Sequence, residues 1–180
     1  MRVVSGSARG RKLKTPENYD IRPTTDNVKE SLFNIIQFEL EGRNVLDLFA
    51  GTGQLGIEAL SRGARSATFV DRDRDAVKIV RENLKTCGFS ARVLNEEAVS
   101  FLRRGERFDV IFVDPPYDAN LYEPVLETIK LIDNLTNGGI IICEARRERQ
   151  LPELSAPYRL RKEYRYGKVK LAIYTKETEF

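Results

Sequence analysis

Residues 47–56 read Asp-Leu-Phe-Ala-Gly-Thr-Gly-Gln-Leu-Gly, and this stretch decides the fold. It continues a predicted buried strand, 45–49, and opens a predicted helix, so a Gly-x-Gly-x-x-Gly turn joins the two. Glycines there let a ligand approach the backbone, and the N-terminus of a helix favours polar or anionic groups. Asp71 lies 20 residues beyond Gly51, at the end of the next predicted strand, where an acid accepts hydrogen bonds from ribose hydroxyls. Together these features predict a nucleoside-binding α/β sheet.

Outward from this stretch, strand and helix patterns alternate, which is typical of a doubly wound sheet. The predicted strands are 45–49, 67–70, 91–94, 110–113 and 140–143. The predicted helices are 28–40, 55–61, 74–86, 98–103 and 121–131. Asn137-Gly138-Gly139 predicts a turn before the last of these strands.

The C-terminal part has a different pattern. Two long strand candidates, 158–166 and 168–174, meet at Gly167 and leave no room for a crossover helix. They therefore predict an antiparallel hairpin. We expect two parts in the chain: a basic hairpin or arm, 1–20, and one α/β domain, 21–180.

Composition narrows the possible chemistry. The chain has 180 residues, 41% of them hydrophobic, and contains neither a long apolar run nor a signal peptide, so we expect a cytoplasmic protein without a membrane partner. The absence of histidine excludes Ser-His-Asp and Cys-His nucleophilic sites and removes the commonest metal ligand. Cys87 and Cys143 fit reduced, small hydrophobic residues. We expect no metal.

The first 14 residues carry only positive charge, although the net charge of the chain is +3. Such a local concentration is suited to contacts with phosphates of a nucleic acid. A solvated, partly disordered terminus is the alternative. The five cations are Arg2, Arg9, Arg11, Lys12 and Lys14.

The acids around the glycine turn indicate which nucleoside binds. Asp47, directly before the turn, would bring negative charge toward the pyrophosphate of a dinucleotide, whereas a cation suits that position. S-adenosylmethionine carries a sulfonium and an ammonium group and no phosphate. Glu97-Ala98, after the predicted third strand, offers an acceptor and a backbone N–H that can read adenine. An acid favoured by the helix dipole is the alternative for Glu97.

Asp114-Pro115-Pro116-Tyr117 follows the apolar run 110–113 and projects from the end of a strand. The prolines restrict the backbone, so a carboxylate and a carbonyl are held as acceptors beside an aromatic ring. This arrangement can grip the exocyclic amino group of a base. A proline turn that starts a helix is the alternative.

In this order, these motifs resemble the Rossmann-like S-adenosylmethionine-dependent methyltransferases that modify exocyclic amino groups, whose signature is Asp/Asn/Ser-Pro-Pro-Tyr/Phe. Residues 9–13 and 22–34 are similar to the N-terminal signatures of the bacterial 16S rRNA guanine-N2 methyltransferases of the small ribosomal subunit. The resemblance implies a three-layer α/β sandwich with a mostly parallel seven-stranded sheet, closed by the C-terminal hairpin. It also implies methyl transfer from S-adenosylmethionine to a guanine N2, by a monomer that binds 16S rRNA or the small subunit.

The resemblance also assigns roles to residues. The catalytic set would be Asp114, Pro115, Pro116 and Tyr117. The cofactor set would be Asp47, Gly51, Gly53, Asp71, Arg72, Glu97, Ala98, Arg22 and Thr25. Two positions depart from the usual pattern: Tyr117, where Phe is common, still stacks, and Arg72 replaces an apolar residue that packs on adenine, a surface its aliphatic stem can cover. A helix cap and a loop cation are the alternatives for Thr25 and Arg22.

Other functions fit parts of the pattern. A DNA adenine N6-methyltransferase also suits Asp-Pro-Pro-Tyr, but 180 residues leave no room for a large target-recognition region. A protein glutamine methyltransferase would carry Asn at position 114. A non-catalytic module that binds S-adenosylmethionine and RNA is a further alternative.

Overall fold

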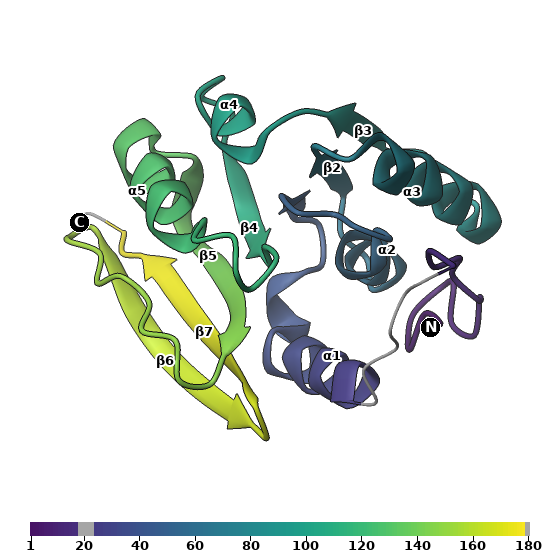
Figure 1. Ribbon diagram of the computed structural model, residues 1–180, viewed down its shortest axis with the longest axis horizontal. Helices are drawn as coiled ribbons and strands as arrows, with labels where there is room; N and C mark the ends of the chain where they lie inside the picture. Colours follow the sequence, from purple (N-terminus) through teal and green to yellow (C-terminus); the bar gives the residue numbers. More distant parts are fainter. Residues whose placement is uncertain (18–23, 179–180) are drawn as a thin grey trace.

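The computed structural model describes residues 1–17 and 24–178, without the side chains of Thr24 and Thr25. Within these residues, seven strands form one sheet in the order β3-β2-β1-β4-β5-β7-β6 (Figure 1). The strands are β1 Asn44–Asp47, β2 Ser66–Asp71, β3 Arg92–Asn95, β4 Phe108–Val113, β5 Leu135–Arg146, β6 Tyr158–Tyr166 and β7 Val169–Lys176. The helices are α1 Thr24–Ile35, α2 Gln54–Ser61, α3 Arg74–Cys87, α4 Ala98–Leu102 and α5 Tyr122–Ile132, with a 3-10 turn, η1 Gln37–Glu39.

The first five strands are parallel, and β7 is antiparallel to both of its neighbours, β5 and β6. β6 and β7 are joined directly and close one edge of the sheet (Figure 1). The predicted mostly parallel sheet with a C-terminal antiparallel hairpin is therefore confirmed.

Both faces of the sheet are buried because successive side chains of a strand point to opposite sides. In β4, Val110 and Phe112 belong to a core cluster that also contains side chains of α1, α2 and α3. Ile111 and Val113 belong to a second cluster, with side chains of α4 and α5. This alternation produces the predicted three-layer sandwich.

β5 is longer than the predicted strand 140–143 and includes the predicted turn 137–139, which corrects that prediction. The register of β5 on β4 is irregular here. Thr136 Oγ1 donates to Asp109 Oδ1 at 2.7 Å and holds the segment on the sheet. A Cβ on Gly139 would lie 2.9 Å from the carbonyl oxygen of Asp109. The glycines thus permit an irregular, close approach within a strand.

Residues 1–17 contain a short hairpin that packs on α2. Its backbone pairing includes a hydrogen bond from Val3 N to Arg11 O at 2.9 Å. The backbone N–H groups of Val4 and Ser5 donate to the carboxylate of Glu58 in α2, at 2.9 and 3.0 Å. The hairpin is therefore attached to the helix that follows the glycine turn.

Two buried polar side chains complete this attachment. Lys29 of α1 lies 3.9 Å from the carboxylate of Glu58, and both side chains are almost inaccessible to water. Asn83 of α3 accepts from Lys14 N at 2.7 Å and donates to Lys14 O at 3.0 Å. The same amide group donates to Thr52 O at 2.8 Å, so one side chain links the hairpin to the glycine turn.

The cations of the hairpin stay exposed although its apolar residues are buried. These cations are Arg2, Arg9, Arg11, Lys12 and Lys14.

The boundary between the predicted parts 1–20 and 21–180 lies outside the described residues, so this division remains a prediction.

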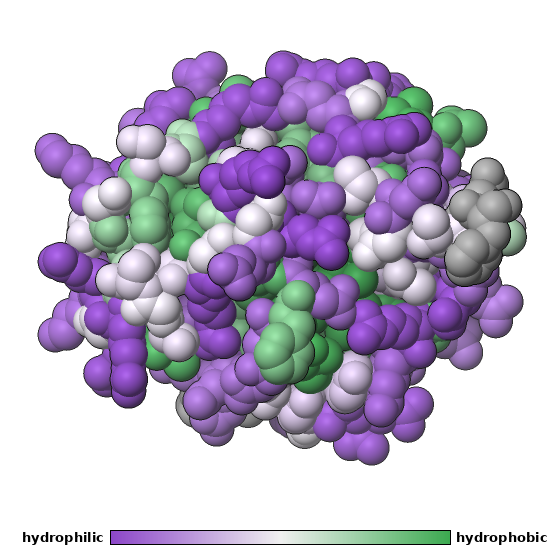
Figure 2. Space-filling view, turned by 180° about the vertical axis from the view of Figure 1, so that it is seen from behind, coloured by the Kyte–Doolittle hydropathy of each residue, from purple (hydrophilic) through white to green (hydrophobic). Residues whose placement is uncertain are grey.

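Among the described residues, no helix combines the length and the apolar character that crossing a bilayer requires. Most of the face seen in Figure 2 is hydrophilic, with smaller hydrophobic areas between the polar side chains.

Candidate active site

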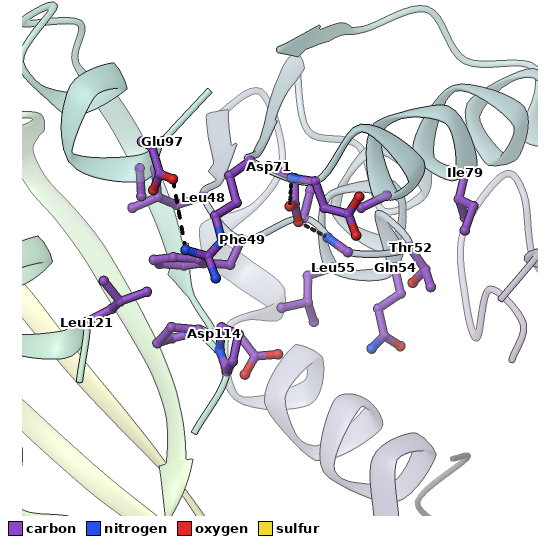
Figure 3. A pocket seen from close by; sticks show the side chains of 18 of the residues that line it. Leu48, Phe49, Thr52, Gln54, Leu55, Asp71, Ile79, Glu97, Asp114 and Leu121 are labelled. Carbon is purple, nitrogen blue, oxygen red and sulfur yellow. Dashed lines mark hydrogen bonds and ion pairs between the residues drawn. The ribbon is translucent and has the colours of Figure 1, made fainter. Parts of the chain in front are cut away.

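A cavity of about 870 Å³ opens at the carboxyl ends of the parallel strands. It is lined by the loops that follow β1, β2, β3 and β4 and by the final part of β5. Figure 3 shows Asp71 and Glu97 on one side of this space, and Asp114 and Leu121 on another. Ligands of open α/β sheets bind at this edge, so the location fits the predicted nucleoside site.

Asp71 stands where the sequence predicts it, at the end of β2 and in the cavity wall. Its Oδ2 accepts a hydrogen bond from Gly51 N at 2.9 Å, and its Oδ1 accepts one from Asp73 N at 2.9 Å. The carboxylate is thereby fixed beside the glycine turn, with remaining acceptor capacity on both oxygens. Gly51, with φ 57°, also lines the cavity.

Gly53 is not among the residues that line the cavity, and its predicted contact with a ligand stays a prediction. It caps α2 in the left-handed region, with φ 80°. Gly56, the third glycine of the motif, brings α2 close to the sheet, because a Cβ there would lie 2.3 Å from the ring of Phe69. These two glycines shape and pack the turn, while Gly51 faces the ligand space.

Asp47 is not among the residues that line the cavity, and its predicted contact with a ligand stays a prediction. Its side chain is 2% exposed, and its Oδ2 accepts from Gly56 N at 2.9 Å. Burial, together with a smaller effect of the charge of Asp71, raises the pKa of Asp47 to about 7 against the opposing effect of the Gly56 N–H. Asp47 therefore fixes the start of α2.

Arg72, Glu97 and Ala98 all line the cavity. The guanidinium of Arg72 lies 3.9 Å from the carboxylate of Glu97, and the dashed line at Glu97 in Figure 3 marks this ion pair. Glu97 occupies the N-cap position of α4, but its side chain makes no capping hydrogen bond. Its carboxylate extends instead toward Arg72.

All four residues of the tetrad 114–117 line the cavity. α5 begins only at Tyr122, so the tetrad is separate from the start of a helix. Tyr117 Oη donates to Glu144 Oε1 at 3.3 Å, and the guanidinium of Arg146 lies over the Tyr117 ring, 5.4 Å from its centre. Both contacts hold the aromatic ring beside Asp114.

Two predicted cofactor residues have no described side chain. Arg22 lies outside the described residues. Thr25 falls within α1, but nothing is described of its side chain. Their contacts therefore remain predictions.

The model of the family described as Conserved hypothetical protein 95 matches residues 1–175. The chain belongs to the Conserved hypothetical protein 95 family. Ribosomal RNA small subunit methyltransferase D of Escherichia coli (strain K12) is 39% identical over 184 residues, which cover 99% of this chain and 91% of that protein. YlbH of Bacillus subtilis (strain 168) is 43% identical over 182 residues, which cover 98% and 99%.

A solved structure of yhhF from Escherichia coli has a TM-score of 0.88, with 38% identity and coverage of 99% of both chains. This agreement along the whole chain confirms the predicted Rossmann-like methyltransferase fold for this member of the Conserved hypothetical protein 95 family.

The cavity contains more acids than the motifs of the sequence predict. Among the described residues, seven carboxylates and one cation, Arg72, line it. Asp73 and Glu96 are sequence neighbours of predicted site residues, and Asp75 lies three positions after Arg72, so their proximity could have been predicted. Glu144 reaches the cavity only through the pairing of β5 with β4. The seven acids are Asp71, Asp73, Asp75, Glu96, Glu97, Asp114 and Glu144.

Proposed function

We propose that this protein transfers a methyl group from S-adenosylmethionine to the exocyclic N2 of a guanine in 16S rRNA. One observation carries the proposal: the Asp114–Tyr117 tetrad lines a single cavity together with Asp71 and Glu97, the two acids predicted to bind a nucleoside. The name of the Escherichia coli relative, a ribosomal RNA small subunit methyltransferase, supports the same reaction class and substrate.

The cavity fits S-adenosylmethionine better than a dinucleotide. Its excess of carboxylates favours a ligand with sulfonium and ammonium charges and disfavours a pyrophosphate. The N–H of Gly51, which a pyrophosphate would need, already donates to Asp71. Asp71 would hold the ribose hydroxyls, while Glu97 and the backbone N–H of Ala98 would hold adenine.

When bound, S-adenosylmethionine supplies an electrophilic methyl group and a leaving group that needs no acid. The N2–C bond forms as the S–C bond breaks, the electron pair of that bond stays on sulfur, and N2 loses one proton. Asp114 and the carbonyl of Pro115 would accept hydrogen bonds from the amino group and direct its lone pair toward the methyl. Asp114 would take the proton, directly or through water.

Positioning accounts for much of the remaining acceleration, because oriented reactants avoid the entropy loss of a bimolecular encounter. Tyr117 would stack on the base, a contact worth about 1–3 kcal/mol in single-stranded recognition. A paired guanine cannot enter such a cavity, so the target must be unpaired or extruded. The exposed cations of the hairpin would hold the surrounding phosphates, and the protein would act as a cytoplasmic monomer.

The test is transfer of labelled methyl from S-adenosylmethionine to small-subunit particles, protein-free 16S rRNA, DNA and cell protein, followed by mapping of the modified nucleotide. N2-methylguanine in 16S rRNA is the expected product. Asp114→Asn should lower the transfer rate by at least about 100-fold, consistent with loss of a proton acceptor, while S-adenosylmethionine affinity stays unchanged. Asp118→Asn, in the same loop with an 89% exposed side chain, is the matched control. Label in DNA, in protein or nowhere would refute the proposal.

A further inference from the structure

We propose that Glu144 accepts a hydrogen bond from N1–H of the target base and thereby selects guanine over other bases with an exocyclic amino group. The inference rests on the proposed function and deepens it. The tetrad explains how an amino group is held, but it does not distinguish guanine from adenine. The required second contact comes from β5.

The register of the sheet places Glu144 beside Asp114. β4 and β5 are parallel, and Val113 pairs with Cys143, so the next positions along the two strands are 114 and 144. Val113 and Cys143 both pack in the cluster that contains α4 and α5. Because side chains alternate along a strand, Glu144 projects to the side opposite Cys143, toward the cavity that Asp114, the residue directly after β4, also lines. Both side chains line the cavity.

Glu144 occupies an unusual place for a carboxylate. It is half-buried between Cys143 and Ala145, which are fully buried, in a strand paired on both sides. Placing a charge there is costly unless polar partners compensate. Tyr122 Oη donates to the main-chain oxygen of Glu144 at 2.7 Å and fixes the backbone at this point. The backbone that carries this carboxylate is thus fixed in the wall of the cavity.

The carboxylate is also tied to the ring that would stack on the base. Tyr117 Oη donates to Glu144 Oε1 at 3.3 Å, which is longer than the usual range for a hydroxyl donor. A base stacked on the Tyr117 ring would present its edge beside that ring. Glu144 and Asp114 would then face neighbouring atoms on one edge of the base.

Guanine matches two neighbouring acceptors because N1–H and the N2 amino group are adjacent donors. Asp114 and the Pro115 carbonyl would hold the amino group, and Glu144 would accept from N1–H. Adenine presents an unprotonated, electron-rich N1 beside its amino group, which a carboxylate repels. A hydrogen bond to a charged group changes discrimination by about 10- to 100-fold.

The test compares 16S rRNA with guanine or 2-aminopurine at the methylated position. 2-Aminopurine keeps the N2 amino group but has no N1–H, so the wild-type enzyme should prefer guanine in kcat/KM by about 10- to 100-fold. Glu144→Gln should lower kcat/KM for guanine and narrow this preference at least about tenfold, because the amide N–H can donate to the unprotonated N1. S-adenosylmethionine affinity should not change. Glu127→Gln, exposed on α5, is the matched control and should keep the wild-type preference.

Each outcome separates the two proposals. Equal wild-type rates on both RNAs, or an unchanged preference in Glu144→Gln, would overturn the role of Glu144 even if overall activity falls. Failure of the wild-type enzyme to methylate guanine N2 would overturn the proposed function and this inference with it. If Glu144→Gln does not fold, Glu144→Asp is the variant to use, because it keeps a carboxylate and should still prefer guanine. Loss of that preference in the folded Glu144→Asp variant would also overturn the inference.

Discussion

Asp47 is a buried carboxylate next to the glycine turn. Its replacement, Asp47→Asn, should make the free energy of unfolding depend less on pH. The Asp47 side chain is 2% exposed, and its burial raises the pKa from 3.8 to about 7. Between about pH 4 and pH 7, the native state therefore holds a proton on Asp47 that the unfolded chain has lost. The free energy of unfolding consequently falls as pH rises through this range.

The magnitude follows from the two pKa values of Asp47. One pH unit within this range corresponds to about 1.4 kcal/mol. Between pH 5 and pH 8, ionisation of Asp47 should lower the free energy of unfolding by about 2–3 kcal/mol. Asn cannot ionise, but it can still accept the hydrogen bond from Gly56 N. The wild-type protein should therefore lose about 2–3 kcal/mol between pH 5 and pH 8 that Asp47→Asn does not lose. The free energy of unfolding of the variant, minus that of wild type, should rise by this amount.

Urea unfolding, followed by circular dichroism at pH 5, 6, 7 and 8 and constant ionic strength, measures this difference. Asp75→Asn is the matched control, because the Asp75 side chain is 83% exposed and its carboxylate is already solvated. The stability difference between this control and wild type should remain nearly constant with pH. A constant difference for Asp47→Asn, or one that falls as pH rises, would refute the reasoning from burial.

Three further predictions concern packing, the hairpin and RNA. Gly56→Ala should lower stability by about 1–3 kcal/mol in urea unfolding, because its Cβ would overlap the ring of Phe69; an unaltered midpoint would contradict the close packing of α2. Glu58→Gln should cost about 3–5 kcal/mol because Lys29 would remain buried without its counter-charge, and the hairpin amides should exchange faster with deuterium. Unchanged exchange would show that Glu58 does not anchor the hairpin. Neutralising three exposed hairpin cations should weaken the salt dependence of RNA binding: the slope of log affinity against log salt concentration should become about 2–3 less negative. The affinity for S-adenosylmethionine should not change. An unchanged slope would exclude these cations from the RNA interface. These cations are Arg9, Arg11 and Lys12.

Most of the fold follows from local sequence patterns. Apolar runs such as 110–113 identify buried strands, and a glycine such as Gly88 identifies a helix end. The start of β5 did not follow from its own residues. Asn137-Gly138-Gly139 indicates a turn locally, but Asp109 of the neighbouring strand binds Thr136 and keeps the segment in the sheet. Such a contact between distant residues is not visible in a local pattern.

The residues of the site divide in the same way, into those that a local pattern predicts and those whose position depends on distant contacts. Asp71 and the tetrad 114–117 were predictable because each follows a strand pattern directly. Asp47 carries the same signal, yet its side chain points to Gly56 N. The local pattern places Asp47 near the end of a strand, but it does not predict the side to which the Asp47 carboxylate points. Glu144 was missed because its proximity to Asp114 depends on the order and register of β4 and β5.

The attachment of the hairpin also imposes an order on folding during synthesis. Residues 1–17 leave the ribosome well before their partners Glu58 and Asn83, which lie much later in the chain. The hairpin therefore cannot reach its final position until α2 and most of α3 have emerged. Until then, its cations and apolar side chains are exposed together, so this segment is made early but becomes protected from proteases and nonspecific partners only late.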